Sequence, residues 1–134
     1  MSMTDAERDS FLREVRIGTL CTLNGDGSPN ALPLWYEWDG TKIRMFSSPD
    51  VGKVRRLRQD PRACLNVADP VGAIEAWVTV EGTVEVLDQG GKELALQLAA
   101  IYYEGDRQEE TLASWGQVDD WVLLELTPTR IRSM

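Results

Sequence analysis

The sequence predicts a mainly β protein in which six strands, joined by hairpins and short helices, form a mostly antiparallel barrel. Short apolar runs rich in β-branched residues recur along the chain, turn residues separate them, and three segments have helical periodicity. At 134 residues the chain is long enough for one adequate core, so we expect a single domain over 1–134. A domain of this size also gains stability from dimerisation.

The N-terminal half predicts one helix followed by three strands. Thr4 and Glu7 have capping-box spacing, which predicts an amphipathic helix over 5–15. Pro33 predicts an edge position for the second strand, because proline cannot donate to a ladder. Turn sequences separate the three expected strands, which are 17–24, 31–38 and 42–46.

The C-terminal half predicts two further helices and three strands. Asp60-Pro61 ends the first of these helices, and Gly82 predicts a bulge or bend inside the long strand. Residues 104–120 are polar and are expected to be irregular. The expected helices are 51–59 and 92–103, and the expected strands are 63–68, 76–87 and 121–132.

The chain is acidic and contains no histidine. With 14 Lys and Arg against 22 Asp and Glu, its net charge is −8. Binding of nucleic acid and of anionic membranes rests on clustered basic residues, so neither partner is expected. Without histidine, a Ser-His-Asp triad, a Cys-His pair and His-ligated zinc or haem are excluded, and no metal site is expected. Chemistry must then come from other side chains or a bound cofactor.

The polar N-terminus is unlike a secretory signal, and no apolar run approaches the roughly 20 residues of a membrane helix. We therefore expect a cytoplasmic protein in which Cys21 and Cys64 form a reduced, buried pair. The five tryptophans are many for this length. Tryptophan is favoured at interfaces and in pockets for flat ligands.

The stretch FSSPDVGKVRRLR (46–58) has the composition of a phosphate cradle. Ser47 and Ser48 end a strand, and Lys53 follows in the first turn of a helix, whose N-terminus attracts anions. Five of the 14 basic residues fall between 44 and 58. The alternative is a helix that is capped at its N-terminus and exposes a solvated basic face.

The strand LPLWYEWDG (32–40) carries aromatic side chains on both of its sides, with Trp35 on one and Tyr36 and Trp38 on the other. A flat heteroaromatic ligand could pack along it. The alternative is a strand whose aromatic residues serve the core and a dimer contact.

Taken together, four segments resemble the flavin-binding split-barrel proteins, the pyridoxamine 5′-phosphate oxidase-like superfamily that includes FMN and coenzyme F-420 oxidoreductases. The resemblance runs from about residue 11 to 88, and its strongest part is K-x-R-x-L-R-x-D-P-R after a strand that ends in small polar residues. The segments are RIGTLCTLNGDGSPNALPLWYEWDG, IRMFSS, KVRRLRQDPRACLNV and WVTVEGTVEVL.

The resemblance implies a six-stranded Greek-key split barrel that forms a homodimer with two cofactor sites at its interface. Ser47, Ser48 and Lys53 would hold the cofactor phosphate. Trp77 would line the same site, from the same chain or from the partner subunit. The ring system would lie along Leu34, Trp35, Tyr36 and Phe46.

Two departures exclude oxidation of the vitamin phosphate itself. Val51 and Gly52 stand where those oxidases carry a polar residue and an arginine, and the chain ends TPTRIRSM without their Arg-x-His motif. Arg55 or Arg56 would then have to replace the missing arginine.

The resulting expectation is an oxidoreductase that uses FMN or coenzyme F-420 for hydride transfer to or from a small molecule. The WYEWDG strand and the KVRRLR helix resemble the F-420 group somewhat more. The alternative is a protein that binds or carries a cofactor without turnover. Haem binding is disfavoured because no histidine is available. No catalytic residue is assigned: Tyr36 is the one candidate acid, and a structural role is the stronger expectation for it.

Overall fold

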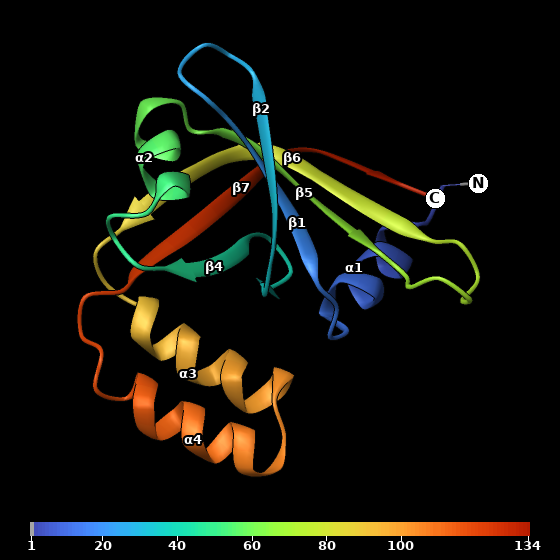
Figure 1. Ribbon diagram of the computed structural model, residues 1–134. Helices are drawn as coiled ribbons and strands as arrows, with labels where there is room; N and C mark the ends of the chain where they lie inside the picture. The colour runs from blue at the N-terminus through green and yellow to red at the C-terminus, as the bar shows by residue number, and fades with distance from the viewer. Residues whose placement is uncertain (1) are drawn as a thin grey trace.

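The computed structural model describes residues 2–134. Within them, seven strands and four helices follow one another along the chain (Figure 1). In order, these are α1 (Asp5–Arg13), β1 (Gly18–Leu23), β2 (Pro29–Leu34), β3 (Glu37–Trp38), β4 (Ile43–Ser47), α2 (Gly52–Gln59), β5 (Arg62–Ala68), β6 (Trp77–Leu87), α3 (Gly91–Tyr102), α4 (Gly105–Trp115) and β7 (Val122–Ser133).

All strands belong to one antiparallel sheet of order β2-β1-β5-β6-β7-β4-β3. The two edge strands, β2 and β3, follow one another in the chain and are joined only by Trp35 and Tyr36. So short a connection between opposite edges forces the sheet to curl until its edges approach each other. The result is the curled half-barrel seen in Figure 1.

The expected six strands are therefore seven. The predicted strand 31–38 divides at Trp35 and Tyr36, because its first half pairs with β1 and its second half pairs with β4. The edge position predicted from Pro33 is confirmed by the place of β2 in the sheet.

The bulge predicted at Gly82 is confirmed. The register between β6 and β7 shifts between Glu81 and Gly82. A Cβ atom at position 82 would lie 2.0 Å from the carbonyl oxygen of Thr127, so only glycine fits this close approach.

The prediction of an irregular segment over 104–120 is wrong for its first part, which forms α4. This stretch is rich in Glu, Gln, Leu and Ala, which favour helix. None of its residues is buried, so the sequence has no apolar periodicity that would predict this helix. Helix α3 contacts β4, β7 and α4, and the two helices lie together beside β4 at one end of the sheet (Figure 1).

The core fills the inside of the curled sheet with side chains such as Leu20, Met45 and Leu65. Helix α1 covers part of it and begins with the predicted capping box: the Glu7 N–H donates to Thr4 Oγ1 at 3.1 Å, and the Thr4 N–H donates to Glu7 Oε1 at 2.9 Å. Among residues 2–134, no helix is both long enough and apolar enough to cross a lipid bilayer.

Candidate functional site

The basic stretch between residues 44 and 58 separates into two environments. Arg44 on β4 is surrounded by acids: its Nη2 lies 3.2 Å from Asp39 Oδ2, its Nε 3.5 Å from Glu125 Oε2, and its Nη1 3.6 Å from Glu37 Oε1. Its charge is balanced within the fold, so it offers little to an anionic ligand.

Lys53 stands in the opposite situation. It is the second residue of α2 and is half-buried. Burial lowers its pKa, and no neighbouring acid counters this effect. A partly desolvated ammonium group without a carboxylate partner is a place where an anion gains more than it would at the open surface.

The start of α2 lacks the side-chain cap that one of the two interpretations required. The N-cap residue is Val51, and no side chain within residues 2–134 accepts a hydrogen bond there. Ser47 is buried and donates from its Oγ to the Ser48 carbonyl oxygen at 2.9 Å, while Ser48 is exposed. The N–H groups of Val54 and Arg55 donate to the Val51 carbonyl oxygen, whereas those of Gly52 and Lys53 have no acceptor within residues 2–134 and remain available to an outside one.

A second cation lies beside Gly52, the residue that precedes Lys53. The Nε of Arg56 donates to Thr22 Oγ1 at 2.9 Å, and its Nη1 would lie 3.0 Å from a Cβ atom added at Gly52. The guanidinium of Arg56 thus occupies the space that a side chain at position 52 would fill. Arg55 donates instead to the Asp50 carbonyl oxygen.

An aromatic cluster adjoins this charge. Trp35 stacks on Tyr102 with ring centroids 4.7 Å apart and an interplanar angle of 14°, and it meets the edge of Tyr103 at 4.7 Å. Phe46 packs 5.6 Å from Trp115. The cluster comprises Trp35, Phe46, Tyr102, Tyr103, Trp115 and Trp121.

A cavity of about 220 Å³ lies where the cluster meets α2. Pockets for ligands of cofactor size span roughly 300–1,000 Å³, so one chain does not enclose such a ligand completely. Four of the eight predicted site residues come together here. The lining residues are Leu34, Trp35, Phe46, Lys53, Tyr103 and Trp115.

The other four predicted residues do not line this cavity: Tyr36, Ser47, Ser48 and Trp77. The Tyr36 side chain turns into the core, 3% exposed, with its ring near Gly18. Burial raises its pKa, and its hydroxyl has no hydrogen-bond partner within residues 2–134. The Tyr36 side chain therefore does not face the cavity beside Trp35. Trp77 begins β6 and pairs with Ala68.

Sequence reasoning missed Tyr103 and Trp115, which reach the cavity from the end of α3 and from α4. The high tryptophan content was the one sequence signal for this aromatic cluster, and it did not indicate which tryptophans belong to the cluster. Three of the five, Trp35, Trp115 and Trp121, belong to the cluster.

Residues 4–134 match the family model described as Pyridoxamine 5′-phosphate oxidase. No curated protein matches the chain. Among solved structures, an "F420 Reductase" is 24% identical, with 92% of this chain and 94% of that chain covered and a TM-score of 0.73.

Two further structures are similar to the chain. A FAD-binding protein from Mesorhizobium loti is 19% identical, with 99% of this chain and 93% of that chain covered and a TM-score of 0.74. A heme binding protein from Mycobacterium smegmatis is 26% identical, with 98% of this chain and 54% of that chain covered and a TM-score of 0.68. With the family match over almost its whole length, the chain belongs to the pyridoxamine 5′-phosphate oxidase family.

Proposed function

We propose that the protein is an oxidoreductase that binds FMN or coenzyme F-420 and exchanges a hydride with a small molecule. The observation that carries the proposal is Lys53, a half-buried cation without an acidic partner that borders an aromatic cavity. This combination fits a ligand with a phosphate at one end and a flat ring system at the other.

The phosphate would be held at the start of α2. Lys53 and the free N–H groups of the first turn would supply charge-assisted hydrogen bonds, and Arg56 adds a second positive charge beside Gly52. The Ser48 hydroxyl is exposed nearby in the chain. Ser47 contributes less than expected, since its hydroxyl already donates to the Ser48 carbonyl.

The ring system would lie against Leu34, Trp35 and Phe46. Trp35 is itself held in place by the stack on Tyr102 at 4.7 Å, whose hydroxyl donates to the Arg16 carbonyl oxygen at 2.6 Å. Because Tyr102 already holds the Trp35 ring in place, Trp35 can orient a flat ligand at low entropic cost.

A bound flavin or deazaflavin supplies the hydride chemistry itself, so the protein needs no histidine. The chain's own task is to bind, orient and exclude water. Lys53 and Tyr103 are the titratable side chains that line the cavity, so a protein-borne proton at this site would come from one of them. Tyr36, buried in the core, is not available for that role.

A second copy of the chain would complete the site. The cavity of about 220 Å³ is too small to enclose the whole cofactor, and Leu34 lies at the sheet edge formed by β2. We therefore propose a homodimer in which Trp77 reaches the cofactor from the partner subunit. Light scattering at micromolar concentration should give about twice 15.0 kDa; a mass of 15.0 kDa would contradict the dimer.

Binding of the cofactor without turnover is the second candidate. It is favoured by the FAD-binding and heme binding proteins among the structural neighbours. Haem itself suits this chain poorly, because the sequence offers no histidine as an axial ligand.

The proposal is tested by titrating the purified protein separately with FMN and with F-420 and following ligand fluorescence. We expect saturable binding of at least one of them. The loaded protein should be bleached by a reductant and recover its absorbance with an electron acceptor. If the ligand binds but its absorbance does not recover after reduction, the result would favour a protein that binds the cofactor without turnover. Failure of both ligands to bind would contradict both candidate functions.

A further inference from the structure

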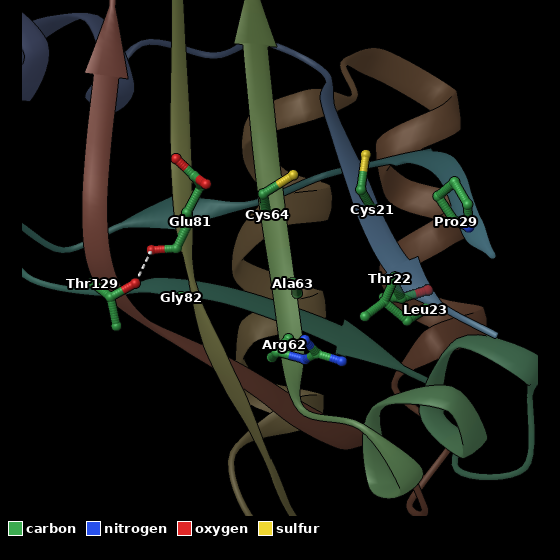
Figure 2. A pocket seen from close by; sticks show the side chains of 10 residues that line it. All are labelled: Cys21, Thr22, Leu23, Pro29, Arg62, Ala63, Cys64, Glu81, Gly82 and Thr129. Atoms are coloured by element: carbon green, nitrogen blue, oxygen red, sulfur yellow. Dashed lines mark hydrogen bonds between the residues drawn. The ribbon is translucent and has the colours of Figure 1, made fainter. Parts of the chain in front are cut away.

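Two cysteines lie directly opposite each other on the outer side of the sheet. In the register of β1 and β5, Cys21 is paired with Cys64. Figure 2 shows both thiols on the same side of the two strands, with the sulfur of Cys64 turned toward Cys21. Both are free thiols and half-buried, not buried as the sequence had predicted.

This placement is close to what a disulfide requires. Opposite residues of an antiparallel pair have Cβ atoms about 4.5–5.5 Å apart, and a disulfide needs about 3.5–4.5 Å. Burial and, second, the neighbouring Cys21 raise the pKa of Cys64 to about 11. A small approach of two adjacent strands is enough to join the sulfurs.

The pair is reachable by small molecules. It lines a cavity of about 420 Å³ beside β1, β5 and β6, and Arg62 and Thr129 are among the other residues that line it (Figure 2). The acid nearest in this cavity, Glu81, is occupied by Arg132, whose Nε lies 2.9 Å from its Oε2. Within residues 2–134 no group of three metal-ligating side chains exists, so a metal centre does not explain the pair.

We propose that Cys21 and Cys64 are a reversible dithiol switch that a low-molecular-weight disulfide oxidises. The thiolate of one cysteine attacks one sulfur of the small disulfide and forms a mixed disulfide, releasing the first small thiol. The other cysteine then attacks the protein sulfur of the mixed disulfide, this bond breaks, and the second small thiol leaves. The two protein thiols lose two protons and two electrons in total, and the small disulfide gains both.

The second step is favoured because the two cysteines are held opposite each other on paired strands, which keeps the remaining thiol beside the mixed disulfide.

Closure of the bond would have a global effect. The closed loop, residues 22–63, contains β2, β3, β4 and α2. It therefore holds every residue that lines the cavity at Lys53 except Tyr103 and Trp115. Cross-linking a loop of this length restricts the unfolded chain and raises its free energy. This inference concerns the opposite side of β1 from the core and does not depend on which cofactor the protein binds.

The test is incubation of the full-length native protein with oxidised glutathione, followed by intact mass measurement and thermal melting. We expect loss of two hydrogen atoms per chain and a rise in Tm of about 5–10 °C, both reversed by dithiothreitol. The variant Cys64→Ser should stop at a mixed disulfide on Cys21, with no rise in Tm. Double replacement by serine should leave mass and Tm unchanged.

Three results would overturn the proposal. These are thiols that react only after the protein is unfolded in urea, glutathione retained on both cysteines of the wild type, and cross-links exclusively between chains.

Discussion

Arg44 and Lys53 belong to one basic stretch of sequence, yet the fold places them in opposite electrostatic surroundings. Arg44 lies on β4 among three carboxylates, Glu37, Asp39 and Glu125, at 3.2–3.6 Å. Lys53 lies in the first turn of α2 beside an aromatic cavity and has no acidic partner that alters its pKa. The fold thus pairs the charge of Arg44 internally and leaves Lys53 without an acidic partner within residues 2–134.

The surroundings of Arg44 explain why its charge is not available to a ligand. Burial alone would raise the pKa of Asp39, but N–H groups of Lys42 and Thr41 and the charge of Arg44 together hold it below the usual value. The carboxylate therefore stays ionised and keeps the guanidinium paired. Within residues 2–134 no acid counters the burial of Lys53 in this way, so a bound anion would offset the cost of its partial desolvation.

The largest effect should come from reversing the charge at Lys53. Lys53→Glu replaces an attraction with a repulsion at the phosphate end and should weaken FMN binding at least ~100-fold. Isothermal calorimetry measures the change. Lys53→Arg, the matched control, should retain most of the affinity, and near-wild-type affinity of the Glu variant would remove Lys53 from the site.

The next effect should come from Arg56, the second cation. Arg56→Ala removes the guanidinium beside Gly52 and should weaken FMN binding about fivefold to tenfold. The same titration checks it, with Arg58→Ala as the control because Arg58 is an exposed residue of the same helix. Equal effects of the two substitutions would show that only general charge matters.

A smaller, few-fold effect should accompany a rise in pH. Burial lowers the pKa of Lys53 below its usual 10.5, so its charge is lost as pH rises through that lowered value. The phosphate is already dianionic above pH 7, so affinity should fall as the pH rises from 7 toward 10.5. In Lys53→Arg the affinity should stay level, since arginine remains charged; a parallel decline there would assign the effect elsewhere.

The smallest effect on binding is expected at Arg44. Arg44→Ala should change FMN affinity by less than about twofold, because its charge is already paired. It should instead lower stability by about 1 kcal/mol, as three carboxylates lose their common partner while remaining partly solvated. Calorimetry and thermal melting separate the two effects. A tenfold loss of affinity would contradict the contrast between Arg44 and Lys53.

Much of the fold follows from local sequence signals. The capping box at Thr4, the edge strand with Pro33 and the bulge at Gly82 each have a local physical cause, and each was predicted correctly. The division of 31–38 had no such signal, because the run is apolar except for Glu37 and the break arises from the curl of the sheet. Helix α4 was not predicted because none of its residues is buried, so its sequence has no apolar periodicity.

The candidate site was predictable to the same extent. Trp35, Phe46 and Lys53 could be placed together because strand ends and helix starts adjoin in the chain. The inward turn of Tyr36 depends on where the strand breaks, which the sequence does not mark. The contributions of Tyr103 and Trp115 depend on how α3 and α4 pack, and this is a tertiary property.

The most direct test of the account compares FMN with riboflavin, which lacks the phosphate, in the wild type and in Lys53→Ala. If Lys53 holds the phosphate, the wild type should prefer FMN, and Lys53→Ala should lose about 1.5–3 kcal/mol of that preference, roughly tenfold or more in the ratio of dissociation constants. Riboflavin affinity itself should be nearly the same in both proteins. An unchanged preference for FMN in Lys53→Ala would contradict the account.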